Sequence, residues 1–230
     1  MKHILTTLVL LVATAAAWAQ PAQGTFSLLP RVGVSLSCLS GDAIYFTDGL
    51  EAKSKIKAGM MAGVDAEYQA LPSLSVSLGA YYSEQGCKYK EAMETYLPYV
   101  PKNTGYSNLQ TNLKYINVPI MLNAYVAHNL AVKAGVQLGF NIDGKMSYTS
   151  TVFTKADDGT VTYEKPVNHK QDAKARKVDV AIPVGLQYEY MNVVIDARYN
   201  FGLTRVYDVE IGDKTHNNVL TISAAYRFTL

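Results

Sequence analysis

Beyond a short amino-terminal segment, the chain has no tryptophan and no apolar run close to the ~20 residues that a transmembrane helix needs. Trp18 lies inside that segment, which begins with basic Lys2 and His3, continues through apolar residues 4–12 and ends in Ala17-Trp18-Ala19. This order is typical of a cleaved secretory signal peptide, and its apolar run is too short for a membrane anchor. We therefore predict a signal peptide at residues 1–19 and one mature domain at residues 20–230. Without a spanning helix, the exported domain is either soluble or a β-barrel.

Neither sign of charge is in excess, and cysteine is scarce. The chain has 21 Lys and Arg against 19 Asp and Glu, and Lys2 leaves with the signal peptide. This balance argues against nucleic acid as a partner. Cys38 and Cys87 are the two cysteines, and the strand pattern below turns them to opposite faces of a sheet. A disulfide needs the chain to have left the sheet there. Two free thiols are the favoured interpretation, and pairing stays open.

The sequence also lacks the common motifs of catalysis and metal binding. It has no nucleotide-binding loop, zinc-ligand spacing, EF-hand or nucleophile elbow. We therefore expect no enzyme activity, no cofactor and no metal. One alternative is an enzyme at the outer rim of a barrel, acting on lipid or peptide, with His216 and Asp213 as an acid–base pair. The remaining candidates are weaker: His128 and His169 as single histidines in a turn and a loop, and Asp157 and Asp158 as calcium ligands.

What the chain does have is alternation. The stretch VVIDARYNF, residues 193–201, places Val193, Ile195 and Ala197 on one side of an extended strand. Asp196 and Arg198 fall on the other side. Segments of this kind recur along the mature chain, and they predict eight strands: 32–38, 60–69, 74–82, 116–126, 130–140, 178–189, 193–201 and 220–230.

The connections between these segments alternate between short and long. Short turns are expected at 71–73, 127–129 and 191–192, and long connections at 41–57, 84–112, 142–176 and 203–217. The short turns pair residues that were already assigned to the apolar face, as antiparallel strands require: Ala70 with Leu74, Val126 with Leu130, and Tyr190 with Val193. The pattern predicts an all-β fold, an eight-stranded antiparallel up-and-down transmembrane β-barrel with short periplasmic turns and long extracellular loops.

Aromatic residues gather near both ends of the strands, which favours lipid as the solvent of the apolar face. One group is expected at the rim with short turns and the other toward the rim with long loops: Tyr68, Tyr188, Tyr190, Tyr226 and Phe228, then Tyr82, Phe140, Tyr199 and Phe201. A soluble exported β-sandwich, in which two apolar faces meet, is the alternative.

The opposite face is expected to line a narrow lumen. Its small residues suggest little bulk, and its charges are predicted to form one polar network: Asp65, Glu67, Lys133, Glu189, Asp196, Arg198 and Arg227. Counting along the strands places Arg227 about as far from the short-turn rim as Asp196. The interior of an eight-stranded barrel is just wide enough for side chains to fill. We therefore favour a structural plug over a transport or proton path.

The long connections carry three further features. Asp158-Gly159 predicts a hairpin that lifts two strands above the membrane. Lys170, Lys174, Arg176 and Lys177 come just before a strand enters the bilayer, where they contact phosphates of the outer-leaflet glycolipid or form an ordinary solvated run. Tyrosines of the second long connection form a partner surface or pack over the barrel mouth: Tyr89, Tyr96, Tyr99 and Tyr106.

Several segments resemble one family. The terminal AAYRFTL is similar to the assembly signal of bacterial outer-membrane barrels, although the last residue is Leu230 rather than Phe. KYINVPIMLNAYV resembles a strand of the PorT-type outer-membrane barrel family, and VDVAIPVGLQYEY followed by VVIDARYNFGL is similar to its later strands. The resemblance implies an eight-stranded barrel, and members of the family include gliding and secretion components besides many proteins of unassigned role.

The expected function follows from these points. We expect a non-enzymatic barrel of the bacterial outer membrane that presents its loops for binding or belongs to an envelope or secretion assembly. Its expected partners are outer-membrane lipid and an envelope protein held by the long loops. We expect the barrel to be monomeric.

Overall fold

The computed structural model describes residues 21–41, 44–47, 50–93, 102–127, 129–156, 158–207 and 215–230, and the predicted signal peptide lies outside these ranges. Within them the chain forms antiparallel β-strands. Eight long strands build the body of the molecule: β1 (Phe26–Ser40), β5 (Lys57–Leu71), β6 (Leu74–Tyr89), β8 (Asn103–Ala127), β9 (Leu130–Lys155), β12 (Val178–Tyr190), β13 (Val193–Gly202) and β14 (His216–Tyr226). No helix in the described ranges is long and apolar enough to cross a membrane.

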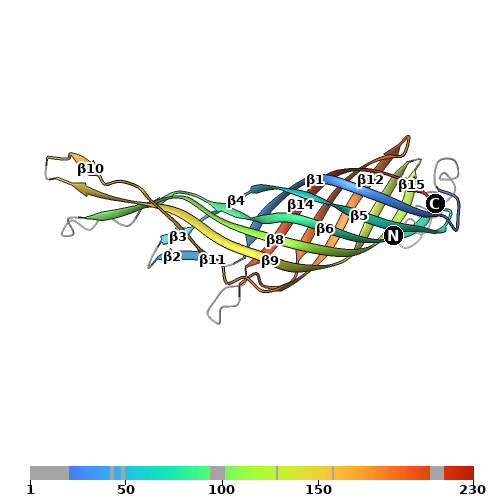
Figure 1. The fold of residues 1–230 in the computed structure, drawn as a ribbon, viewed down its shortest axis with the longest axis horizontal. Coiled ribbons are helices and arrows are strands. Elements are labelled where there is room, and N and C mark those ends of the chain that lie inside the picture. Colours follow the sequence, from blue (N-terminus) through green and yellow to red (C-terminus); the bar gives the residue numbers. More distant parts are fainter. Residues whose placement is uncertain are drawn as a thin grey trace, which may run out of the picture.

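These eight strands pair in a closed ring. The order is β9-β12-β13-β14-β1-β5-β6-β8, and β8 pairs with β9 to complete the circle. Closure supplies every strand with two neighbours, so that no backbone edge faces lipid. The eight-stranded antiparallel barrel expected from the alternation is confirmed, and Figure 1 shows its tilted strands around one axis.

The expected registers are confirmed over the bodies of the hairpins. Tyr190 pairs with Val193 as expected. In the other two short hairpins the ladder keeps the expected register as far as Gln69 opposite Ser75 and Tyr125 opposite Ala131. Each of these ladders then shifts by one residue. The last pairs are therefore Leu71 with Leu74 and Ala127 with Leu130, because a bulge in each hairpin leaves a two-residue turn in place of the expected three-residue turn.

The strands run well beyond the expected boundaries at the long-loop end. β8 begins at Asn103 rather than at residue 116, and β9 continues past residue 140 to Lys155, as the hairpin predicted at Asp158-Gly159 implied. The expectation of one continuous loop over 84–112 was therefore wrong. Alternation reports burial of one face, and above the membrane both faces meet water. The pattern thus disappears where the backbone pairing continues.

The upper parts of β8 and β9 form an extension that projects from one end of the barrel (Figure 1). Short strands complete it: β7 (Ala92–Met93) pairs with β8, while β10 (Val161–Tyr163) and β11 (Val167–Asp172) pair with β9. The remaining short strands are β4 (Ser54–Lys55) beside β6, β15 (Phe228–Thr229) beside β1, and the separate ribbon of β2 (Ile44–Thr47) and β3 (Leu50–Ala52).

The apolar side chains of the barrel point outward. Val32, Ile120 and Leu186 are among those that are exposed, whereas the alternate positions along the same strands are buried and mostly polar. The expected aromatic residues at both barrel ends are exposed or partly exposed on this outer face. A soluble β-sandwich would cover such a surface with a second sheet. In the closed ring of strands this outer surface stays exposed, so the sandwich alternative is wrong.

The orientation of this surface gives a test. Ile120 is 58% exposed on β8 and pairs with Leu78 and Val136 in the middle of the barrel wall. Ile120→Lys is expected to lower the free energy of unfolding by about 2–4 kcal/mol in lipid vesicles, because it moves a charge into the hydrocarbon. The measurement is urea unfolding in vesicles, followed by far-UV circular dichroism.

The matched control is Val161→Lys on β10. Val161 is 39% exposed but belongs to the extension, outside the bilayer. Its replacement is expected to change the free energy of unfolding by no more than about 0.5 kcal/mol. Equal losses from the two substitutions would contradict the assignment of the barrel wall to lipid.

Candidate functional site

The lumen holds a cluster of five charged side chains, the central ion network, at its middle. Asp196 accepts from Lys133 at 2.9 Å and from the Nε of Arg198 at 2.8 Å, and its Oδ2 lies 3.6 Å from Arg31. Asp65 forms an ion pair of 2.7 Å with Arg31. All five side chains are at most 3% exposed. Three cations thus share two carboxylates in a space from which bulk water is excluded.

Tyr81 joins the two halves of this network. Its hydroxyl donates to Asp65, and Arg198 donates to the same hydroxyl at 3.3 Å. The guanidinium carbon of Arg198 also lies 5.4 Å from the centre of the Tyr81 ring. Gly79 makes room for this arrangement, because a Cβ there would lie 2.6 Å from Asp65 Oδ1.

A second cluster, the lower ion network, lies nearer the short turns. Arg227 donates from Nε to both oxygens of Glu189 at 3.0 Å, and its Nη1 lies 3.2 Å from Glu67. Glu67 also accepts from Tyr125 at 3.1 Å and from Ser75 at 2.9 Å. This cluster has one cation and two carboxylates. It therefore offsets the surplus cation of the central network, and the two together carry no net charge.

The charged residues expected in the lumen thus fall into two groups rather than one. Asp65, Lys133, Asp196 and Arg198 lie in the central network, and Glu67, Glu189 and Arg227 in the lower one. The expected height of Arg227 was wrong. Its backbone N–H bonds to Asn192 in the short turn, whereas Asp196 lies opposite Ser223, four residues earlier on the neighbouring strand.

Three residues of these networks were missed by the sequence analysis: Arg31, Tyr81 and Tyr125. The signal was present in the alternation. Arg31 has the parity of Gly33 and Ser35, and the strand begins at Phe26 rather than at residue 32. The tyrosines share the parity of the small inward residues, so the expectation of an inner face without bulk was also wrong.

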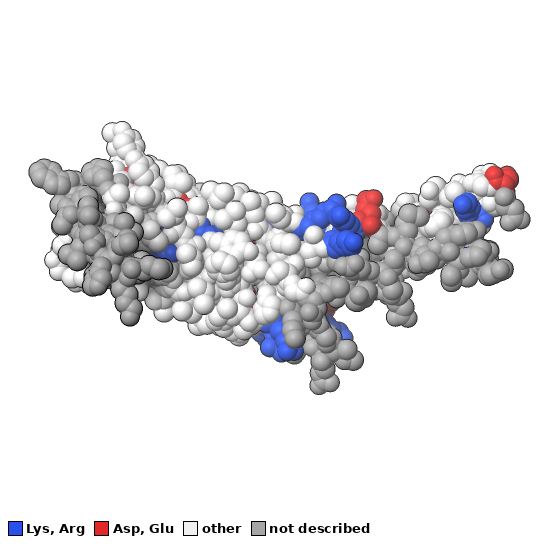
Figure 2. Space-filling model, turned by 180° about the vertical axis from the view of Figure 1, so that it is seen from behind, with Lys and Arg blue, Asp and Glu red and all other residues white. Residues whose placement is uncertain are grey.

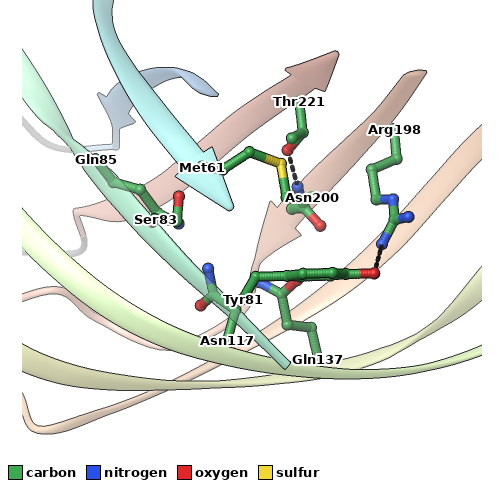
Figure 3. A pocket seen from close by; sticks show the side chains of 9 residues that line it. All are labelled: Met61, Tyr81, Ser83, Gln85, Asn117, Gln137, Arg198, Asn200 and Thr221. Carbon is green, nitrogen blue, oxygen red and sulfur yellow. Dashed lines mark hydrogen bonds between the residues drawn. The ribbon is translucent and has the colours of Figure 1, made fainter. Parts of the chain in front are cut away.

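Above the central network lies a small polar cavity. Its free volume is about 10 Å³, which is roughly one water-sized sphere. Figure 3 shows Arg198 reaching the Tyr81 hydroxyl at one side and Asn200 donating to Thr221 at the other. Amides and hydroxyls dominate the lining: Met61, Tyr81, Ser83, Gln85, Asn117, Gln137, Arg198, Asn200 and Thr221.

An apolar cap covers the lumen at the base of the extension. It consists of eight buried side chains: Leu39, Cys87, Tyr89, Leu109, Leu113, Tyr115, Ala173 and Val206. A bulge in β8 between Ser107 and Gln110, with Asn108 at φ 53°, turns Leu109 into this cap. Cys87 and Cys38 are both free thiols. Burial raises the pKa of the Cys87 thiol to about 11, so it stays protonated at neutral pH.

The basic residues expected near the glycolipid phosphates lie on exposed positions. Lys170 belongs to β11, while Lys174, Arg176 and Lys177 follow it and lead into β12. Lys177 directly precedes Val178, which pairs with Phe140 of the outer aromatic group. Figure 2 shows Lys and Arg side chains gathered on both edges of the molecule, about midway along its length.

The candidate catalytic and calcium-binding residues are not brought together as far as the structure describes them. His128, Asp157 and Asp213 lie outside the described residues. His169 stacks on Tyr148 with ring centres 4.7 Å apart, and its Nε2 lies 2.8 Å from Ser150 Oγ. Asp158 accepts from the backbone of Thr160 in the expected hairpin turn, and this hydrogen bond lowers the pKa of the carboxyl.

Two of the four tyrosines of the second long connection are described by the structure, and they lie in different places. Tyr89 is buried in the apolar cap, and Tyr106 lies edge-on to Tyr148 in the extension, with ring centres 6.0 Å apart. Tyr96 and Tyr99 lie outside the described residues.

A family model with the description outer membrane protein beta-barrel domain matches residues 18–208 of the chain, in agreement with the closed ring and the outward apolar face. The chain belongs to this family. It is therefore an outer-membrane β-barrel protein, located in the bacterial outer membrane and in contact with its lipid. Among curated proteins, no sequence matches the chain significantly.

Solved structures that are similar to the chain include bacterial outer-membrane and surface proteins. Ail of Yersinia pestis is 13% identical, with a TM-score of 0.41 over 90% of this chain and 100% of that one. Neisserial surface protein A is 12% identical, with a TM-score of 0.44 over 88% and 97%. OprG of Pseudomonas aeruginosa is 10% identical, with a TM-score of 0.43 over 91% and 99%.

The central ion network gives a stability test. Asp196→Ala removes the carboxylate that Arg31, Lys133 and Arg198 share, and leaves buried cations without their anion. The free energy of unfolding is expected to fall by about 3–5 kcal/mol. Asp172→Ala is the control, because Asp172 pairs with Lys145 on the exposed extension, where solvent screens the ion pair and its loss should leave the free energy of unfolding nearly unchanged. Equal losses, measured by urea unfolding in vesicles, would contradict the role of the network in stability.

Proposed function

We propose that the protein is a non-enzymatic barrel that anchors its extension at the cell surface, where the extension binds a protein partner of the envelope. The observation that carries this proposal is apolar surface beyond the bilayer. Val161, Tyr163 and Val167 are exposed on β10 and β11, and Tyr163 reaches 66% exposure. Side chains of this kind outside the lipid are typical of an interaction surface.

The strand pairing of the extension supports the same proposal. In the described part of the chain, β10 and β11 each pair with β9 and with no other strand. Their outer edges therefore offer unpaired backbone groups, to which an extended segment of another protein can add as a further strand. A partner bound in this way would place the protein in an envelope or secretion assembly, as the resemblance to PorT-type barrels implies.

The lumen has a structural role in this proposal. The central and lower ion networks and the apolar cap act as a plug, and the barrel acts as a monomeric anchor. Residues 1–19 direct export and are removed. The rim-enzyme alternative rests on His216 and Asp213, and Asp213 lies outside the described residues.

Site-specific photo-crosslinking in native cells tests the binding surface. A photoreactive amino acid in place of Tyr163 or Val167 is expected to form one discrete adduct with an envelope protein. The adduct from Val167 should disappear when the tip, which includes Tyr163, is removed by replacing residues 92–106 and residues 151–166 each with an Asn-Gly turn. The first replacement joins residues 91 and 107, which continue the register of β7 with β8, and the second joins the paired residues Ser150 and Val167. The barrel below is therefore retained.

The controls are a photoreactive residue at Ile120, which should label lipid, and His216→Ala, which should leave the adduct unchanged. Adducts from Tyr163 and Val167 that are indistinguishable from those of Ile120 would contradict a partner on the extension. A hydrolytic activity lost on His216→Ala would favour the enzyme instead.

The basic run before β12 is proposed to contact phosphates of the outer-leaflet glycolipid. Lys177 lies beside the outer aromatic group, at the height of the lipid headgroups. Each lysine near an anionic surface contributes about 1 kcal/mol, so Lys174→Gln with Lys177→Gln should weaken lipopolysaccharide binding roughly 30-fold. The measurement is lipopolysaccharide retained on the purified protein across a detergent wash series. Unchanged retention would show that the run is only solvated.

A further inference from the structure

A basic groove lies at the base of the extension, on residues that neither the ion networks nor the proposed partner surface uses. It measures about 600 Å³ and lies where β4, the end of β6 and the bulge of β8 meet. Its described lining has three lysines, one glutamate, two amides and two apolar or aromatic side chains: Lys55, Lys88, Lys90, Glu91, Asn108, Gln110, Tyr89 and Leu109.

The lysines of this groove lie close to one another, which is electrostatically unfavourable. Lys55 and Lys88 are directly opposite each other on paired strands, and both are exposed. Lys90 follows on the same face of the chain, and its backbone N–H bonds to Lys53. Like charges opposite each other destabilise a sheet. Among the described residues, no ion pair or hydrogen bond is formed by the ammonium groups of Lys55, Lys88 or Lys90.

The other polar groups of the groove suit hydroxyls. Gln110 of β8 lies opposite Lys88 of β6. Asn108 is exposed, and the bulge holds its backbone in the left-handed conformation. Amides both donate and accept, so they can bind sugar hydroxyls, while the ammonium groups bind acidic substituents. Tyr89 and Leu109 form a buried floor beneath them.

The height of the groove distinguishes it from the lipid phosphates. Tyr82 marks the outer aromatic group on β6, and Lys88 follows six residues later on the same strand. Six residues of strand span about 20 Å, which is about 15 Å along the membrane normal at the usual barrel tilt. The lysines are thus expected above the headgroups, in the layer occupied by surface polysaccharide.

We propose that this groove binds an acidic glycan, a saccharide chain that carries sulfate, phosphate or carboxylate groups, through Lys55, Lys88 and Lys90. Asn108 and Gln110 bind its hydroxyls. The site is separate from β10 and β11, and it functions whether or not the extension has a protein partner.

Binding of dextran sulfate to the purified full-length protein in nanodiscs tests the site, with neutral dextran as the control ligand. We expect dextran sulfate to bind with an affinity that falls as salt is raised, and neutral dextran not to bind. Lys55→Gln with Lys88→Gln should weaken binding at least tenfold. Lys174→Gln with Lys177→Gln, on the basic run before β12, should change it less than twofold. Heat-modifiability on gels checks that each variant has kept its barrel.

Other ligands and variants separate the alternatives. Retention of lipopolysaccharide should not change in the Lys55 and Lys88 variant, because the groove lies above the lipid phosphates. Equal weakening of dextran sulfate binding by both pairs of substitutions would overturn the site in favour of general charge attraction. Polyglutamate that binds as tightly as dextran sulfate, and is lost in the same variant, would overturn the assignment to carbohydrate. Absence of dextran sulfate binding to the wild-type protein would overturn the proposal itself.

Discussion

Inside a bilayer no water satisfies the backbone, and closure of the sheet is the constraint on which the rest of this structure depends. The pairing of β1 with β14, the first and last of the eight long strands along the chain, closes the ring. The hairpin of β8 and β9 belongs to the same ring and continues past the membrane, where it becomes the backbone of the extension. One hairpin therefore forms part of the closed barrel wall and also carries the surface on which we place the function.

Closure with eight strands has a second consequence, because it leaves an interior that side chains fill. Charges in such a space must neutralise one another. The central network holds one surplus cation and the lower network one surplus carboxylate, so the two networks together are neutral. Tyr81 and Tyr125 fill the volume between charges and donate to Asp65 and Glu67. The apolar cap completes the filling at the extracellular end.

Alternation predicted the barrel, its strand order and its registers because lipid and lumen impose opposite polarity on successive residues. It stopped at residue 116 of β8 and residue 140 of β9, since beyond the membrane both faces meet water while the backbone continues to pair. Parity could have placed Arg31, Tyr81 and Tyr125 in the lumen. It could not show which charges meet, because contacts across the lumen, such as that of Lys133 with Asp196, depend on strand tilt and side-chain length. The basic groove needs the bulge at Asn108, which no periodicity indicates.

The central claim is that the barrel is a filled anchor and that function resides outside the membrane. Current through the purified wild-type protein in planar lipid bilayers tests this most directly, alongside the variant that lacks the tip of the extension. The account predicts no steady conductance steps from either protein, because the ion networks and the cap lie below the cut. Stable, ion-selective steps from the wild-type protein would contradict it and would make the charged lumen a transport path.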